Sequence, residues 1–208
     1  MSEGRIQNVI FDLGGVLVDW SPKYLYNKIF SGDKKKVDWF LSTVCTNEWN
    51  VEQDGGRTLA EATRSLIREF PDQEVHIRSY YDRWEEMING EIKGTVDILE
   101  ELKQRNRHKL YALTNWSAET FPIALQRFNF LSHFQGIVVS GEENTRKPFR
   151  KIYDILLDRY DLDPGRSLFI DDSQANVEAG EEAGIKSILF TSSDRLRTDL
   201  KEMGILDG

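Results

Sequence analysis

The stretch VIFDLGGVL at residues 9–17 decides the fold of this chain. Its first three residues are β-branched or aromatic, and the run stops at Asp12, which is followed by Leu13 and two glycines. A short run that is apolar almost throughout is typical of a strand covered on both faces. Similar runs recur at residues 109–113, 137–139, 167–170 and 187–190.

Helical patterns separate these apolar runs from one another. They lie at roughly 94–105, 117–132, 148–160, 173–183 and 193–203. Strand alternating with helix is the pattern of a parallel sheet with right-handed crossover connections. The sequence therefore predicts an α/β core with a doubly wound, Rossmann-like parallel sheet.

Residues 18–90 interrupt this alternation. They show no strand pattern, but four of the five tryptophans lie there, together with helical patterns near 22–31, 34–44, 58–70 and 73–88. We predict a small all-helical domain inserted after the first strand, with residues 1–17 and 91–208 forming the α/β core. Most of its aromatic side chains are expected to pack in its own core, and one or two of them could line a cleft.

Composition narrows the class of protein. The chain of 208 residues carries 35 acidic and 27 basic side chains, a net charge of −8. This balance argues against a nucleic-acid or membrane partner, because either surface needs a basic field. The single cysteine, Cys45, excludes an internal disulfide and fits a reducing compartment. With no apolar leader and no apolar stretch of roughly 20 residues, we expect a cytoplasmic protein, whose oligomeric state the sequence does not predict.

The chemistry is expected where the strands end, because ligands of parallel sheets bind beyond the carboxyl ends of the strands. Polar residues follow the first four apolar runs: Asp12, then Thr114 and Asn115, then Ser140, then Asp171 and Asp172. Lys147 follows the third run closely enough to reach the same edge. Three carboxylates, the Thr114 hydroxyl and the Asn115 amide should thus converge.

Three carboxylates at one edge repel one another unless a cation lies between them. A hard divalent cation with oxygen ligands, Mg²⁺, resolves this conflict and attracts a phosphate group. Lys147 and Thr114 could then hold the remaining phosphate oxygens, while Asp12 is placed to attack phosphorus and form an aspartyl-phosphate. A single aspartate after a strand is more often a helix cap, but a cap does not explain carboxylates at several strand ends.

This combination resembles the haloacid dehalogenase-like (HAD) hydrolase superfamily, over nearly the whole chain. Residues 11–17 (FDLGGVL) resemble its first motif, which carries the nucleophilic aspartate, and Leu113-Thr114-Asn115 resembles the second. Lys147-Pro148 resembles the third motif. Residues 169–173 (FIDDS), followed by Asn176, resemble the acidic fourth motif.

The resemblance implies a role for each site residue. Asp12, the Gly14 carbonyl and Asp172 would bind Mg²⁺, with Asp171 as a further ligand or a neighbouring partner. Thr114, Asn115 and Lys147 would hold the phosphoryl group. The helical insert matches the small cap that closes over the site in relatives. The implied activity is that of a Mg²⁺-dependent phosphatase for a small phosphorylated metabolite, of the sugar-phosphate class on which some Asp-Leu-Gly relatives act.

The sequence departs from the family pattern at Gly14. Family phosphatases usually carry there a second aspartate that acts as general acid and base, a contribution of about 10²- to 10⁴-fold. Asp19 and Asp54 are candidate replacements. The pair Gly55-Gly56 permits a tight loop that would bring Asp54 or Arg57 to the substrate, although a plain interhelix turn explains it equally well.

Other interpretations also remain open. Trp116 directly follows the second motif and could either form a wall of the substrate site or pack at a helix start. The protein could instead be a metal-independent 2-haloacid dehalogenase, whose relatives also lack an aspartate at the position of Gly14 but lose the acidic pair. It could also be a weakly active binding protein of the HAD fold.

Overall fold

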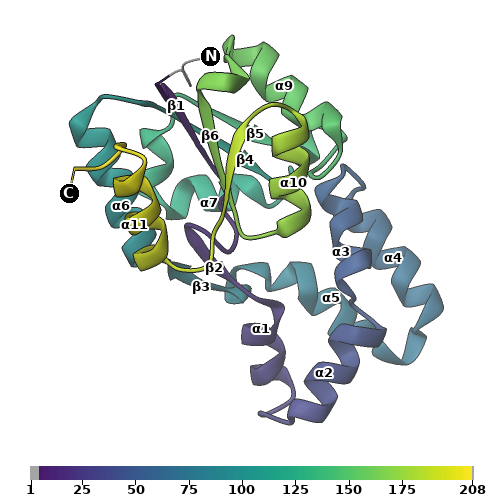
Figure 1. Ribbon diagram of the computed structural model, residues 1–208. Helices are drawn as coiled ribbons and strands as arrows, with labels where there is room; N and C mark the ends of the chain where they lie inside the picture. The colour runs from purple at the N-terminus through teal and green to yellow at the C-terminus, as the bar shows by residue number, and fades with distance from the viewer. Residues whose placement is uncertain (1–4, 208) are drawn as a thin grey trace.

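The computed structural model describes residues 5–207, and its centre is a five-stranded parallel sheet (Figure 1). The strands lie in the order β5-β4-β1-β6-β7, with bounds β1 (Asn8–Phe11), β4 (Lys109–Thr114), β5 (Gly136–Val139), β6 (Ser167–Asp171) and β7 (Lys186–Leu189). These are the five apolar runs of the sequence. The predicted doubly wound α/β core is confirmed.

Strand β1 lies in the middle of the sheet and pairs on both sides. Phe11 is level with Ala112 of β4 and with Ile170 of β6. Because the three strands are parallel and in this register, the residues at their carboxyl ends emerge at one edge of the sheet. These residues are Asp12, Thr114 and Asp171, as the sequence predicts.

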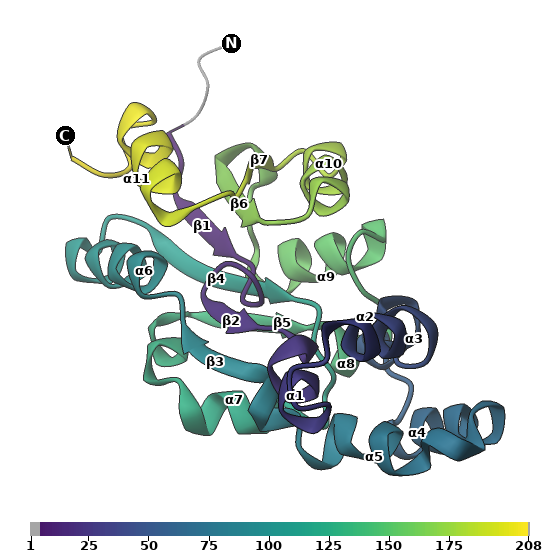
Figure 2. The ribbon, with the colours of Figure 1, turned by 90° about the horizontal axis from the view of Figure 1, so that it is seen from below.

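Helices cover both faces of the sheet (Figures 1 and 2). In β1, Val9 and Phe11 pack in one apolar cluster with α6 and α11, whereas Ile10 packs in another with α9. This alternation follows from the two-residue period of a strand. The helices have bounds α6 (Lys93–Arg105), α7 (Phe121–Arg127), α8 (Ser140–Glu143), α9 (Arg150–Tyr160), α10 (Gln174–Glu182) and α11 (Ser193–Glu202). Within residues 5–207, no helix has the length and apolar character needed to cross a bilayer.

The helical insert extends from the sheet edge as a separate group of helices (Figure 2). Its members are α1 (Pro22–Ile29), α2 (Lys34–Thr43), α3 (Asn47–Asp54), α4 (Leu59–Glu69) and α5 (Glu74–Asp82). An aromatic cluster forms its core: the Tyr26 and Phe40 rings lie 4.6 Å apart, and the Tyr26 hydroxyl donates to the His76 carbonyl at 2.9 Å. Core packing of these aromatic residues is therefore confirmed.

Two strands in this segment contradict the prediction that it holds none. β2 (Val18–Trp20) and β3 (Ile88–Glu91) form an antiparallel pair where the chain leaves and re-enters the core. They are three and four residues long, and their register shifts between Asp19 and Trp20. Elements this short and irregular have too few residues to show a two-residue period.

Two helices also differ from the predicted ranges. α3 ends at Asp54, so this residue lies at a helix end, not in the predicted loop. The predicted helix 117–132 is shorter: α7 begins just before Pro122, which lacks an N–H and is typical of a first turn, and a 3₁₀ helix follows at Asn129–His133.

We predict that Gly141→Ala destabilises the protein. The Gly141 N–H donates to the Trp116 carbonyl at 3.1 Å, and an added Cβ would lie 2.8 Å from that carbonyl oxygen and even closer to the Ala118 nitrogen. Both are backbone atoms, so the free energy of unfolding should fall by about 1–3 kcal/mol, as measured by urea denaturation. Gly165→Ala is the control, because its Cβ would only touch Asp163 at 3.4 Å; equal losses in both variants would contradict the prediction.

Candidate active site

The carboxyl edge of the sheet brings together the predicted residues of the first, second and fourth motifs. Asp12 follows β1, Thr114 ends β4, and Asp171 ends β6. Lys147 comes from the segment after α8. Thr114 and Asp171 are completely buried, and Asp12 and Lys147 are 7% and 1% exposed.

The Lys147 ammonium group lies between two carboxylates. Its Nζ is 2.9 Å from Asp12 Oδ1 and 2.6 Å from Asp171 Oδ2, and it donates to the Leu113 carbonyl at 2.9 Å. The three donors of the ammonium group are thus used, which fixes its position. Asp171 is held from the other side, since its Oδ1 accepts from the Ser173 N–H at 2.8 Å and from Asn176 Nδ2 at 2.9 Å.

Three carboxylates gather at this edge. Asp12, Asp171 and Asp172 each offer an oxygen atom, and these oxygens all lie within 4.8 Å of one another. The Asp172 carboxylate packs against Gly15, whose φ of +75° suits glycine and where a Cβ would overlap it. Lys147 supplies one positive charge against three negative ones, so this donor set fits a divalent cation bound by oxygen ligands.

Electrostatics at the site favour an additional cation. Burial raises the pKa of Asp12 to about 7, with a further upward contribution from the charge of Asp171, although Lys147 opposes it. Burial and the Asp171 charge also raise the pKa of Asp172. Burial alone would lower the pKa of Lys147, but Asp12 and Asp171 outweigh this effect and raise it. Lys147 therefore stays charged while the carboxylates remain incompletely compensated.

The two residues of the second motif behave differently. The Thr114 hydroxyl is buried and has no hydrogen-bond partner within residues 5–207. Asn115 has both ends of its amide engaged by Lys147: Nδ2 donates to the Lys147 carbonyl at 3.0 Å, and Oδ1 accepts from the Lys147 N–H at 2.8 Å. Asn115 thus positions the Lys147 backbone, and its contact with a phosphoryl group stays a prediction.

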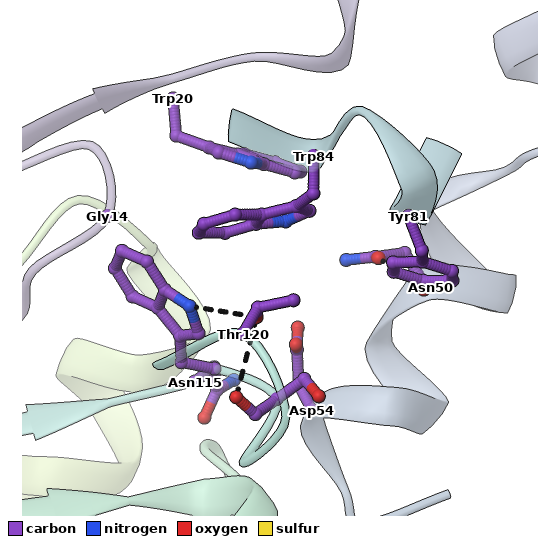
Figure 3. Close-up of a pocket in the computed structure, with 10 residues that line it drawn as sticks. Gly14, Trp20, Asn50, Asp54, Tyr81, Trp84, Asn115 and Thr120 are labelled. Carbon is purple, nitrogen blue, oxygen red and sulfur yellow. Dashed lines mark hydrogen bonds between the residues drawn. The ribbon is translucent and has the colours of Figure 1, made fainter. Parts of the chain in front are cut away.

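A cavity of about 80 Å³ lies between this edge and the helical insert (Figure 3). Trp20 and Trp84 lie along one side of it and Asp54 along the other. The lining combines core and insert: Gly14, Asn115, Trp116, Ser117 and Thr120 come from the core, and Trp20, Asn50, Asp54, Tyr81 and Trp84 from residues 18–90.

Several residues predicted near the substrate can now be placed. Trp116 packs against Phe121 at the start of α7, with ring centroids 5.8 Å apart. It also lines the cavity, and its contact with a substrate stays a prediction. Asp54 lines the cavity, whereas Arg57 bonds Gln53 and the Trp49 carbonyl inside the insert. Asp19 accepts from the Tyr24 hydroxyl at 2.8 Å. Of the candidate replacements for the carboxyl missing at Gly14, only Asp54 reaches the cavity.

Asn50 and Thr120 line the cavity but were not singled out from the sequence. Asn50 accepts from the Tyr81 hydroxyl at 3.1 Å, and Thr120 from Trp116 Nε1 at 3.1 Å. Asn50 lies in α3, which the sequence did not predict as a helix, so its direction could not be derived. Thr120 lies in a turn that was predicted as helix.

Comparison with known proteins agrees with this geometry. The sequence model of the haloacid dehalogenase-like hydrolases matches residues 9–190. The chain therefore belongs to this family of hydrolases, as its motifs indicate.

Individual relatives are distant but span the chain. A sesquiterpene phosphatase of Aspergillus oryzae is 25% identical over 93% of this chain and 94% of its own length. A phosphorylated-carbohydrates phosphatase of Thermotoga maritima is 24% identical, over 88% and 84%. A HAD-family enzyme of Bacteroides thetaiotaomicron, solved with magnesium and inorganic phosphate, superposes with a TM-score of 0.68 at 25% identity, over 90% of this chain and 95% of that one.

We predict that Lys147→Met destabilises the metal-free protein strongly. Removing the ammonium group leaves Asp12 and Asp171 buried without their partner, a change that typically costs about 3–5 kcal/mol. Denaturant unfolding in EDTA measures this loss. The neighbouring Lys151 is exposed, so Lys151→Met should change the unfolding free energy little; a Lys147→Met protein as stable as this control would contradict the role of the buried ion pairs.

Proposed function

We propose that this protein is a Mg²⁺-dependent phosphatase that uses Asp12 as its nucleophile. The observation that carries the proposal is the position of the Lys147 ammonium, 2.9 Å from Asp12 Oδ1, at an edge that also holds Asp171, Asp172 and the buried Thr114 hydroxyl. A fixed ammonium group and a set of cation-binding carboxylates beside a buried nucleophile suit attack on a phosphate ester.

Asp12, Asp172 and the Gly14 carbonyl are the proposed Mg²⁺ ligands. No N–H within residues 5–207 donates to the Gly14 carbonyl, which leaves its oxygen free. Both oxygens of Asp171 already accept hydrogen bonds, from Lys147 on one side and from Ser173 and Asn176 on the other. We therefore assign Asp171 to positioning Lys147. Mg²⁺ supplies charge neutralisation for the phosphate oxygens when bound.

Each side chain of the site then has its own role in the proposed reaction. The free oxygen of Asp12 attacks phosphorus, and its other oxygen stays bonded to the Lys147 ammonium and the Leu13 N–H, the latter at 2.7 Å. Lys147 lowers the repulsion between the carboxylate and the anionic substrate. The Thr114 hydroxyl donates to a phosphoryl oxygen, and Asn115 holds the Lys147 backbone in place. The resulting aspartyl-phosphate is hydrolysed by water.

The proposed substrate is a small phosphorylated metabolite of the sugar-phosphate class. The cavity at this edge combines polar side chains such as Asn50 and Asp54 with the rings of Trp20 and Trp84, and the Thermotoga maritima relative is named for phosphorylated carbohydrates. Residues 18–90 would act as the cap that closes over this substrate, and residues 1–17 and 91–208 as the catalytic core. A buried single cysteine, Cys45, is consistent with a cytoplasmic location.

Two alternatives have a physical argument against them. A metal-independent 2-haloacid dehalogenase would have to keep Asp12, Asp171 and Asp172 together without a cation, which like-charge repulsion opposes. A weakly active binding protein would not need an ion pair of Lys147 and Asp171 fixed beside the carboxylate of Asp12. Assays of phosphate release, chloride release and ligand binding distinguish the three functions.

We predict metal-dependent phosphate release that requires Asp12. The purified protein is assayed on a panel of sugar phosphates and on p-nitrophenyl phosphate, with Mg²⁺ and with EDTA. Asp12→Asn should lose essentially all activity, because an amide is a far weaker nucleophile. Release that survives in Asp12→Asn would refute the assignment. No release from any substrate, with chloride released from 2-chloropropionate, would establish the dehalogenase; binding without turnover would establish the binding protein.

We also predict that Mg²⁺ binding releases a proton below pH 7. Since the pKa of Asp12 is raised to about 7 in the metal-free protein, the ligand must lose its proton on binding at pH 6 but not at pH 8. Affinity should therefore rise up to about tenfold per pH unit towards pH 7 and then level off. Calorimetry in buffers of different ionisation enthalpy measures the proton. Asp172→Asn should weaken binding and the exposed-residue control Asp72→Asn should not; a pH-independent affinity would contradict the prediction.

A further inference from the structure

The end of α3 places a carboxyl group of the insert beside the cavity at the carboxyl edge of the sheet. Asp54 is the last residue of α3, and the two glycines that follow allow a close approach to the core. A Cβ on Gly55 would lie 3.8 Å from Arg146 Cδ, and one on Gly56, whose φ is +105°, would overlap the Asn144 side chain. Gly56 therefore lets the end of α3 pack directly against the core segment that leads to Lys147.

Polar contacts hold the end of α3 against the core, and they come from residues before and after Asp54 in the chain. Glu52 forms an ion pair with Arg146 at 3.5 Å, and the Leu59 N–H donates to Glu119 Oε1 at 2.7 Å. Both contacts join the insert to the core. Asp54 lies between them in the chain and faces the cavity (Figure 3).

The Asp54 carboxyl is free to exchange a proton. Within residues 5–207 its hydrogen-bond partner is the backbone N–H of Ser117, and no side chain bonds to it. Burial raises its pKa to about 7, although Arg146, Lys147 and the Ser117 backbone N–H pull in the opposite direction. The other titratable groups that interact with it are the hydroxyls of Tyr80 and Tyr81, whose pKa values are raised beyond the neutral range. On the insert side of the cavity, Asp54 is thus the group that titrates near neutral pH.

The core leaves an opening for this carboxyl. A Cβ on Gly14 would meet no atom within 4 Å, and Gly14 lines the same cavity as Asp54. The other carboxylates near the site have other roles. In the core, Asp171 bonds Lys147, Asp172 is a proposed Mg²⁺ ligand and Asp12 attacks phosphorus; in the insert, Asp19 accepts from Tyr24. A leaving alcohol in the cavity would have Gly14 on its core side and Asp54 on its insert side.

We propose that Asp54 is the general acid and general base of the phosphatase reaction, supplied by the cap. This inference rests on the proposed function. In the first step the bond between phosphorus and the leaving oxygen breaks, Asp12 bonds to phosphorus, and Asp54 gives its proton to the departing alkoxide. In the second step a water molecule attacks phosphorus, its proton passes to the Asp54 carboxylate, and the bond from Asp12 to phosphorus breaks. Asp54 is protonated again, and the net reaction consumes one water.

The test compares leaving groups in Asp54→Asn. An alkyl phosphate needs the acid to protonate its leaving oxygen, so turnover should fall by about 10²- to 10⁴-fold. p-Nitrophenyl phosphate has a good leaving group and still transfers its phosphoryl group to Asp12, but the missing base slows hydrolysis. We therefore expect a burst of one nitrophenol per enzyme, followed by a slow steady state. The fall of wild-type kcat/KM above pH 7, where the acid is deprotonated, should disappear in the variant.

Glu48→Gln is the matched control, since it changes a carboxylate to an amide on the same helix, at an exposed position that does not line the cavity. It should keep wild-type turnover and show no burst. If Asp54→Asn is poorly folded, Asp54→Ala assayed with added formate provides a second test, in which restored turnover is expected. Unchanged kinetics in Asp54→Asn, or an equal loss on both substrates without a burst, overturns the proposal. Absence of activity in the wild type overturns the proposed function instead.

Discussion

The contact of one buried ammonium group with two carboxylates determines the arrangement of the catalytic edge. Lys147 lies within 3 Å of Asp12 and Asp171, and none of the three side chains is appreciably exposed. Burying such charges is costly unless each finds a partner. The surrounding groups meet this requirement: Leu113 accepts from the ammonium, and Asn176 donates to Asp171. Compensation of the Lys147, Asp12 and Asp171 charges therefore favours an arrangement in which the segments that carry these three residues, far apart in the chain, lie together.

The sheet makes this meeting possible. β1 lies between β4 and β6, and all three run in the same direction, so their carboxyl ends fall at one edge. Lys147 is not on a strand, and its position depends on Asn115, which bonds both its N–H and its carbonyl. The two residues of the second motif thus differ: the Thr114 hydroxyl is buried with no hydrogen-bond partner among residues 5–207, while Asn115 fixes the backbone of the third motif.

The sequence was informative where a physical rule links it directly to the structure. Apolar runs predicted the strands, and the rule for ligands of parallel sheets placed Asp12, Thr114 and Asp171 together. It was uninformative for elements that depend on tertiary contacts. The strands β2 and β3 are too short for a period to appear, and α3 has polar residues such as Asn50 and Gln53 buried against Tyr81. Its helical form was therefore missed, and with it the direction of Asp54.

The division of the site between two parts of the chain has a consequence for specificity. In the proposed mechanism the core holds the groups that bind a phosphate and form a bond to it, and these groups do not discriminate between the alcohols that carry the phosphate. The cavity proposed to hold that alcohol is lined in part by Trp20, Trp84 and Asp54, all from residues 18–90. If the proton donor also comes from this segment, catalysis requires the insert to be seated on the core. A substrate whose alcohol is too large to let the insert pack against the core then loses both the binding surface of the insert and the proton donor. Its turnover falls for that reason, so the shape of the cavity determines which substrates react quickly.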